Sequence, residues 1–342
     1  MPCNITAWES VKIFQFIINV PCFICGLILN ALAIWVFCCK MKKWTETTVY
    51  MINLAITNCN LIFSIPFKLY AYVTPWNLGE STCSLFEGLH YIYTYTSIYT
   101  AVLISLHRYF AIIYPFKSRN YRSTVKAIVM CTVIWLFITG LSIPISLTTS
   151  SSKLKNVSNM HCFQKTSTKP WPVSMLLTIE IVGFFGPLLV LSFCAIQIIR
   201  CLKQKRNVAE EEEEKKLRQI MHIIAANITV FIICFMPVHL GYVIKYIVET
   251  QENQKQAPDC STLNTVHSVI HILTAMANIN CCLDAICYYI VATDFRKASF
   301  GNKLYKDSSK MCHSTIRSKS QNISSRDIIN HSNYESNMDT IN

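Results

Sequence analysis

The sequence from residue 13 to residue 38, IFQFIINVPCFICGLILNALAIWVFC, contains no Asp, Glu, Lys or Arg. A helix that crosses the hydrocarbon core of a bilayer needs about 20 predominantly apolar residues, so this stretch predicts a membrane-spanning helix. Six more apolar runs follow it. The predicted spans are 13–38, 48–73, 80–113, 125–148, 171–202, 216–248 and 262–291. The predicted fold class is therefore an all-α membrane protein, a seven-transmembrane helix bundle.

The composition of the whole chain agrees with a lipid environment. Its 342 residues are 52% hydrophobic and only 15% charged, whereas soluble proteins average about 25% charged residues. The net charge of +12 does not indicate nucleic-acid binding, because the basic residues lie between the apolar runs. No zinc-ligand spacing, phosphate loop or nucleophile–base arrangement is present. We therefore expect no metal centre, no cofactor and no enzymatic activity.

The distribution of basic residues predicts the orientation of the spans. Lysine and arginine follow the first and seventh predicted spans, and they also lie between spans three and four and between spans five and six. With seven spans these segments share one side, which the positive-inside rule assigns to the cytoplasm. Residues 1–12 are then an extracellular N-terminus of a multi-pass plasma-membrane protein. Two sequons, at Asn4 and Asn156, fall outside, and we expect both to be glycosylated.

Four of the 17 cysteines fall on the predicted extracellular side, namely Cys3, Cys83, Cys162 and Cys260. Disulfides form and persist in that oxidising environment. One pairing joins Cys83, at the start of the third span, to Cys162 in the loop before the fifth, which leaves Cys3 for Cys260. Four cysteines allow three connectivities, and spacing alone does not choose among them.

An ordered set of polar and helix-breaking residues connects the chain to a known family. The set runs from Gly26 and Asn30 in the first span through Asn53-Leu54-Ala55, His107-Arg108-Tyr109, Trp135, Pro187, Phe231 to Pro237, and Asp284 to Tyr288. In this order the residues resemble the rhodopsin-like (class A) G-protein-coupled receptors up to about residue 300.

Shorter stretches give a closer resemblance within that family. The segments Trp35 to Cys39, Trp44 to Thr47 and Asn280 to Tyr289 are similar to the kynurenic-acid-responsive receptor. The segments Ser64 to Lys68 and Pro237 to Gly241 are similar to its sibling, the lysophosphatidylinositol receptor.

The resemblance implies a division of the chain and a set of partners. Residues 13–291 form the transmembrane domain, 292–304 a short cytoplasmic interfacial helix, and 305–342 a disordered cytoplasmic tail. The implied partners are a heterotrimeric G protein of the inhibitory or twelve/thirteen class, and arrestin bound through the phosphorylated tail.

The resemblance also assigns residues to activation and G-protein coupling. They are His107, Arg108, Tyr109, Phe231, Phe235, Pro237, Asp284 and Tyr288. Arg108 contacts the G protein once the sixth span swings outward. His107 stands where the family usually has an aspartate that holds the arginine by an ion pair. Because an imidazole cannot supply that pair, we expect raised basal signalling. Ala285 replaces the family's usual proline.

The carboxylate of the family's polar core also comes from a different span in this sequence. Asn58 occupies the position of the sodium-binding aspartate, and Asp284 supplies a carboxylate from the seventh span instead. We expect Asn30, Asn58, Ser97 and Asp284 to form a polar core. Two forms of this core stay open, a sodium site and a protonated, hydrogen-bonded Asp284.

Charged and aromatic residues near the outer ends of the spans predict the ligand site, because intramembrane charges are functional candidates. The predicted ligand-binding set is Lys68, Glu87, His90, Tyr91, Tyr95, Lys245, His267 and His271. Lys68 and Glu87 could instead pair with each other. The loop from residue 150 to residue 170 carries four lysines and no acid, which favours anions.

The predicted function is thus a G-protein-coupled receptor for a small anionic metabolite or lysophospholipid. The ligand is expected in the extracellular half of the bundle. A decoy receptor that binds ligand without coupling, and a secondary transporter, are the alternatives. An enzyme is not among them.

Overall fold

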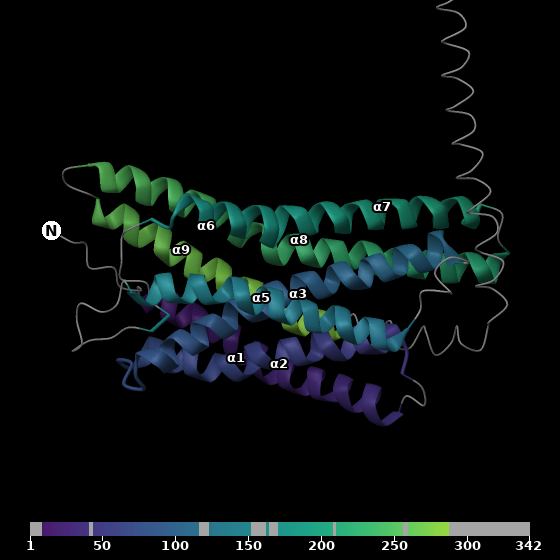
Figure 1. Cartoon of the computed structure of the whole chain (residues 1–342), viewed down its shortest axis with the longest axis horizontal. Coiled ribbons are helices and arrows are strands. Elements are labelled where there is room, and N and C mark those ends of the chain that lie inside the picture. Colours follow the sequence, from purple (N-terminus) through teal and green to yellow (C-terminus); the bar gives the residue numbers. More distant parts are fainter. Residues whose placement is uncertain are drawn as a thin grey trace, which may run out of the picture.

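The computed structural model describes residues 9–40, 44–115, 123–151, 162–163, 170–207, 210–255 and 259–286. Within these ranges every regular element is a helix (Figure 1). The elements are α1 (Glu9–Trp35), the π-helix η1 (Val36–Lys40), α2 (Glu46–Val73), α3 (Glu80–Ile113), α5 (Thr124–Ser151), α6 (Val173–Leu177), the π-helix η2 (Thr178–Phe185), α7 (Gly186–Arg206), α8 (Glu211–Gln254) and α9 (Cys260–Asn278).

The predicted fold class is confirmed by seven segments of the described chain that are long and apolar enough to cross a membrane. They are Glu9–Cys39, Glu46–Val73, Glu80–Ile113, Thr124–Ile143, Val173–Arg206, Glu211–Gln254 and Cys260–Ile286. The third matches the predicted 80–113 at both ends. The sixth is longer than the predicted 216–248 at both ends, because a helix that is longer than the bilayer can continue into water.

Several predicted features lie outside the described residues. They are Cys3, Asn4, Asn156, Tyr288, the end of the seventh span at residue 291, the interfacial helix 292–304 and the tail 305–342.

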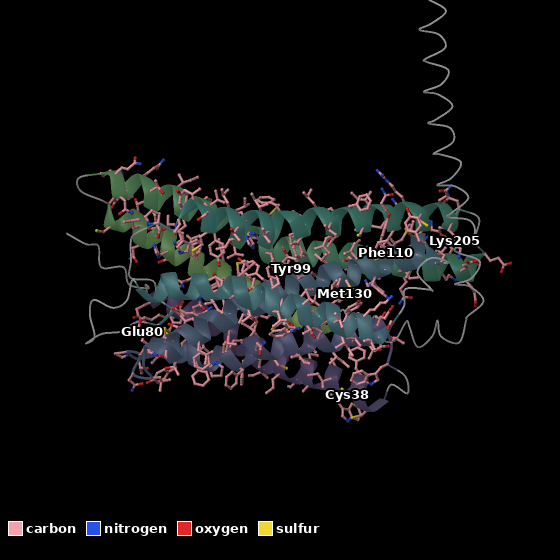
Figure 2. The ribbon with its side chains drawn as sticks, in the orientation of Figure 1. Cys38, Glu80, Tyr99, Phe110, Met130 and Lys205 are labelled. Atoms are coloured by element: carbon pink, nitrogen blue, oxygen red, sulfur yellow. A yellow bond between two sulfur atoms is a disulfide. The ribbon has the colours of Figure 1, made fainter. Side chains whose placement is uncertain are left out.

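The long helices lie side by side along the longest axis of the bundle (Figure 1). Glu80, at the start of α3, and Lys205, near the end of α7, lie at opposite ends (Figure 2). The end that holds Cys83 and Glu80 is called the disulfide end below. The opposite end, which holds Arg108 near the end of α3, is called the Arg108 end.

The bundle exposes apolar side chains and buries polar ones. Leu136 and Leu189 are each 71% exposed, whereas Asn30, Asn58 and Thr96 are fully buried. This pattern is reversed relative to a soluble protein. It follows from a bilayer as solvent, in which lipid covers apolar side chains and polar side chains hydrogen-bond between helices.

The fifth span contains a π-helix just before Pro187. Pro187 has no backbone N–H and disfavours a regular α-helical turn, and η2 ends two residues before it, at Phe185. Short π-helical turns often lie at functional sites. On η2 the side chains of Glu180 and Phe184 are buried. Gly183 lets α3 approach, since a Cβ there would lie 2.6 Å from Cε1 of Tyr95.

The start of α9 is fixed by its N-cap. The carboxylate of Asp259 accepts hydrogen bonds from the hydroxyl of Thr262 at 2.6 Å and from the backbone N–H of Ser261 at 3.0 Å. These hydrogen bonds lower the pKa of Asp259, which lies outside the spans. The cap therefore sets the position at which α9 enters the bundle.

Candidate functional site

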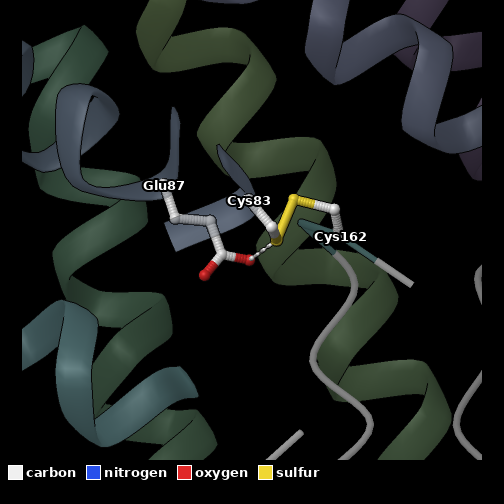
Figure 3. Close-up of side chains that lie close together, drawn as sticks. All are labelled: Cys83, Glu87 and Cys162. Carbon is white, nitrogen blue, oxygen red and sulfur yellow. Dashed lines mark hydrogen bonds between the residues drawn. A yellow bond between two sulfur atoms is a disulfide. The ribbon is translucent and has the colours of Figure 1, made fainter. Parts of the chain in front are cut away.

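The disulfide end is closed by a bond between Cys83 and Cys162, with a Cα–Cα distance of 5.6 Å. The structure thus selects one of the three connectivities that the sequence leaves open, and this predicted disulfide is confirmed (Figure 3). Cys260 is also disulfide-bonded, and its predicted partner Cys3 lies outside the described residues.

Glu87 lies beside this disulfide. Its Oε1 accepts a hydrogen bond from the backbone N–H of Phe163 at 3.0 Å and lies 3.8 Å from Sγ of Cys83 (Figure 3). The carboxylate therefore holds the loop residue that follows Cys162, a contact that sequence reasoning missed. Although the two sulfurs and this carboxylate are close together, sulfurs that are bonded to each other are not thiolate ligands for a metal.

Lys68 on α2 is the unusual charge of this end. Its side chain is 5% exposed, and it forms no ion pair or hydrogen bond with any residue that the structure describes. The alternative in which Lys68 merely pairs with Glu87 is therefore wrong. His90 on α3 and His271 on α9 share the surroundings of Lys68.

His271 is itself held in place by two neighbours. The hydroxyl of Tyr72 lies 2.9 Å from Nδ1 of His271, and the side-chain amide of Gln15 donates to its backbone carbonyl at 2.6 Å. Helices α1, α2 and α9 are thus tied together beside Lys68. The predicted residues Lys68, His90 and His271 lie in one cluster.

Lys245 and His267, predicted in the same set, are paired to a carboxylate that sequence reasoning missed. Nζ of Lys245 and Nε2 of His267 lie 3.0 Å and 2.9 Å from Oε1 of Glu249. Lys245 also lies 4.5 Å from the ring centre of Trp171. Glu249 was missed because the predicted sixth span ended one residue before it, although its i,i+4 spacing from Lys245 is readable.

Tyr91 and Tyr95 lie one turn apart on α3. The ring of Tyr95 lies 6.2 Å from that of His239 on α8, so Tyr95 faces α8. Beneath them Nδ1 of His239 on α8 lies 3.3 Å from Oε1 of Glu180 on η2. Sequence reasoning singled out neither member of this pair, although an acid inside a predicted span is a readable signal.

The predicted polar core is assembled in the middle of the bundle. The side-chain amide of Asn58 donates to Oδ1 of Asn30 at 3.0 Å. The hydroxyl of Ser97 and the side-chain amide of Asn280 donate to Oδ2 of Asp284 at 3.3 Å and 2.9 Å. Oδ1 of Asn58 is buried and has no hydrogen-bond partner among the described residues. A carboxylate, a hydroxyl and this amide oxygen fit a sodium ion, which prefers oxygen ligands.

A cavity of about 70 Å³ joins the polar core to the Arg108 end. Ser97 and Asp284 line it near the core, and Arg108 and Asn227 line it near the helix ends. Phe231 and Phe235, whose ring centres are 5.3 Å apart, also line it. The predicted activation residues Arg108, Phe231, Phe235 and Asp284 therefore face one space.

His107 has a carboxylate partner. Its Nε2 lies 2.8 Å from Oε2 of Glu46, the first residue of α2. The other oxygen of Glu46 accepts from the backbone N–H of Ser123, just before α5. Glu46 thus joins the ends of α2, α3 and α5, a restraint on α3 that sequence reasoning missed. The missing ion pair to Arg108 and the raised basal signalling stay predictions.

The fold and the site define a seven-helix membrane receptor with a polar cluster at one end and a buried cavity that reaches an arginine at the other. The sequence profile described as 7 transmembrane receptor (rhodopsin family) matches residues 29–288. The chain therefore belongs to the rhodopsin family of G-protein-coupled receptors. As a member it is a multi-pass membrane receptor of a family that signals through G proteins, and that family consists of receptors, not enzymes.

Three relatives place it more closely within the family. Human G-protein coupled receptor 35 is 32% identical over 274 residues, which cover 80% of this chain and 82% of the relative. Mouse G-protein coupled receptor 55 is 33% identical over 299 residues, covering 84% and 88%. Human lysophosphatidic acid receptor 6 is 32% identical over 274 residues, covering 79% and 78%. The predicted kinship with the lysophospholipid and kynurenic-acid receptors is confirmed.

Proposed function

We propose that the receptor binds an anionic ligand, a small metabolite or a lysophospholipid, at the Lys68 cluster. The main observation in favour of this proposal is that Lys68 is 5% exposed and has no ion-pair partner among the described residues. A buried charge without a partner costs several kcal/mol. A carboxylate or phosphate placed beside Lys68 offsets this cost, so the site favours an anion.

The neighbours of Lys68 support the same ligand chemistry. His90 can donate a hydrogen bond to an anion from the ring nitrogen that carries its proton, and His271 from Nε2, because its Nδ1 is already bonded to Tyr72. Tyr91 and Tyr95 offer hydroxyls deeper in the bundle. Lys245 and His267 already hold Glu249, so they form the rim of the site. Lysophosphatidic acid, after which the relative lysophosphatidic acid receptor 6 is named, is an anionic lysophospholipid.

In this proposal the disulfide end is extracellular and the Arg108 end is cytoplasmic. The Cys83–Cys162 bond supports that orientation, since disulfides persist on the oxidising side of a membrane. The predicted glycans on Asn4 and Asn156 belong to the same side.

Coupling is proposed for the opposite end of the bundle. Arg108 and Tyr109 contact a G protein of the inhibitory or twelve/thirteen class when α8 swings outward at Pro237. Phe231 and Phe235 repack during this movement, and Tyr288 belongs to the same switch. Asn58, Ser97 and Asp284 would hold a sodium ion, whose charge stabilises the carboxylate. Arrestin is the proposed partner of the phosphorylated tail.

The proposal is tested by G-protein activation in cells that express the wild type, Lys68→Gln or Arg108→Ala at equal surface density. Anionic metabolites and lysophospholipids are the probes. We expect Lys68→Gln to reduce potency by about 30-fold or more, since losing one partner of a buried charge pair costs about 2–5 kcal/mol.

Arg108→Ala separates a coupling receptor from a decoy. We expect it to abolish the response while binding persists. A response that Lys68→Gln leaves unchanged contradicts the assigned anion site. Binding without any evoked response in the wild type contradicts coupling.

A further inference from the structure

Glu180 and His239 form a buried pair that the proposed function does not use. Glu180 lies on η2 and is 5% exposed, and His239 lies on α8 and is 1% exposed. Their outer atoms, Oε2 of Glu180 and Nε2 of His239, are buried and have no hydrogen-bond partner among the described residues. Buried polar groups are rarely left without a partner, so each such atom requires an explanation.

The chemistry of the two outer atoms follows from the bond between the residues. An ionised carboxylate only accepts hydrogen bonds, so Nδ1 of His239 is the donor to Glu180. In a neutral imidazole Nε2 is then an acceptor. In either form of the imidazole, Oε2 of Glu180 is an acceptor without a donor, so the group that satisfies it carries an N–H or O–H donor.

The pair lies next to the proposed anion site and deeper in the bundle. The ring of Tyr242 lies 5.8 Å from that of His239. Tyr95 on α3 lies 6.2 Å from the same ring, and His90 of the Lys68 cluster precedes it on α3. Helix α3 thus carries residues of both the Lys68 cluster and the surroundings of the pair.

We propose that Glu180 and His239 form a second polar subsite, which receives an N–H or O–H group of the ligand. The inference rests on the proposed function, since the anion at Lys68 fixes the other end of the ligand. It narrows the ligand class to anions that carry a separate hydrogen-bond donor, and it predicts that plain anions are poor ligands.

The subsite has a direct connection to the activation residues. The ring of His239 stacks on Phe184, with centroids 4.5 Å apart and planes at 13°. Phe184 in turn stacks on Phe231 at 5.8 Å, and Phe231 lies 5.3 Å from Phe235. A ligand group bound to His239 therefore acts on the aromatic stack that lines the cavity leading to Arg108.

The test compares probes that differ by one hydroxyl. Kynurenic acid is paired with quinoline-2-carboxylate, which lacks the hydroxyl, and 1-oleoyl lysophosphatidic acid with its deoxy analogue. Oleate serves as a plain anion. G-protein activation is measured for the wild type, Lys68→Gln, Glu180→Gln and the double variant Glu180→Leu/His239→Phe. The double variant removes both polar groups and keeps a ring against Phe184, so it remains foldable if a single change is not.

We expect the hydroxyl-bearing member of the active pair to be about tenfold or more potent than its analogue on the wild type. In the double variant the potencies of the two members become equal within about twofold. The maximal response of the double variant also falls, because the ligand no longer forms a hydrogen bond to the ring that packs on Phe184. Lys68→Gln weakens both members and keeps their ratio.

A ratio that persists in a surface-expressed double variant overturns the subsite and leaves the anion site standing. A wild type that responds to oleate but to neither pair of probes also overturns the subsite and leaves the anion site standing. If Lys68→Gln leaves the potencies of both probes unchanged while the double variant loses the potency ratio between them, the anion site is contradicted and the subsite is supported. A wild type that responds to none of the five probes overturns both assignments.

Discussion

Two buried lysines at the disulfide end are expected to affect stability in opposite directions when no ligand is bound. Lys68 is 5% exposed and Lys245 is 4% exposed, so both charges are removed from water. Lys245 is compensated by Glu249 at 3.0 Å, whereas Lys68 has no ion-pair partner in the described part of the chain. Lys245→Gln is thus a control matched to Lys68→Gln in residue type, burial and location.

The magnitudes follow from these contacts. Replacing Lys68 by neutral Gln removes an uncompensated charge whose desolvation costs several kcal/mol. With some of that cost already relieved by relaxation, we expect a gain of about 1–2 kcal/mol in the free energy of unfolding. Lys245→Gln leaves Glu249 in contact with His267, at 2.9 Å. Breaking one side of a buried pair costs about 3–5 kcal/mol, and we expect a loss near the lower limit.

The assay is thermal unfolding of the purified, unliganded receptor in detergent at neutral pH. Exposure of buried thiols such as Cys194 and Cys234 reports unfolding. We expect a higher midpoint for Lys68→Gln and a lower one for Lys245→Gln. If Lys68→Gln lowers the midpoint as much as Lys245→Gln does, Lys68 has a stabilising partner in the folded receptor, and the argument for an anionic ligand is refuted.

Three further changes test other parts of the structure. His107→Asp places a carboxylate beside that of Glu46, which lies 2.8 Å from the imidazole in the wild type. We expect thermal unfolding to show a loss of about 1–3 kcal/mol in the free energy of unfolding, larger than the loss for His107→Asn. Equal losses for the two variants would contradict the pair of His107 and Glu46. Gly183→Ala brings a Cβ to 2.6 Å from the ring of Tyr95, and overpacking of this kind costs about 1–3 kcal/mol. Gly140→Ala, which meets nothing within 4 Å, is its neutral control in the same unfolding assay, and equal effects of the two changes would contradict the close approach. Glu46→Gln keeps the shape but removes the charge, so we expect a loss of about 1 kcal/mol for this partly exposed pair, measured by thermal unfolding, and no loss would mean that the junction of α2, α3 and α5 contributes nothing.

The spans could be predicted from the sequence because hydrophobicity is local. The third span was predicted at both ends, since Glu80 opens it and Pro115, which disfavours helix in the residue before it, follows its end. The predicted polar core also came together, because Asn30, Asn58, Ser97 and Asp284 are polar residues within membrane spans, and such residues hydrogen-bond between helices.

The partners of the charged residues could not be predicted in the same way. Glu46 lies 61 residues from His107, and Glu180 lies 59 residues from His239. These pairs depend on the rotation and depth of helices relative to one another, which spacing within one helix does not contain. The restraint on α3 through His107 and Glu46 was therefore missed, although its carboxylate was present in the sequence.

The π-helix η2 has a consequence for comparison between species and paralogues. Each residue of an α-helix turns the chain by about 100°, so one residue more or fewer in this turn would rotate everything on its N-terminal side onto a different face. A homologue whose fifth span is a regular α-helix therefore needs a one-residue gap near residues 178–185. Without that gap, an alignment anchored at Pro187 would match the wrong residues to Trp171, Leu176 and their neighbours, and would transfer ligand contacts to side chains that face lipid.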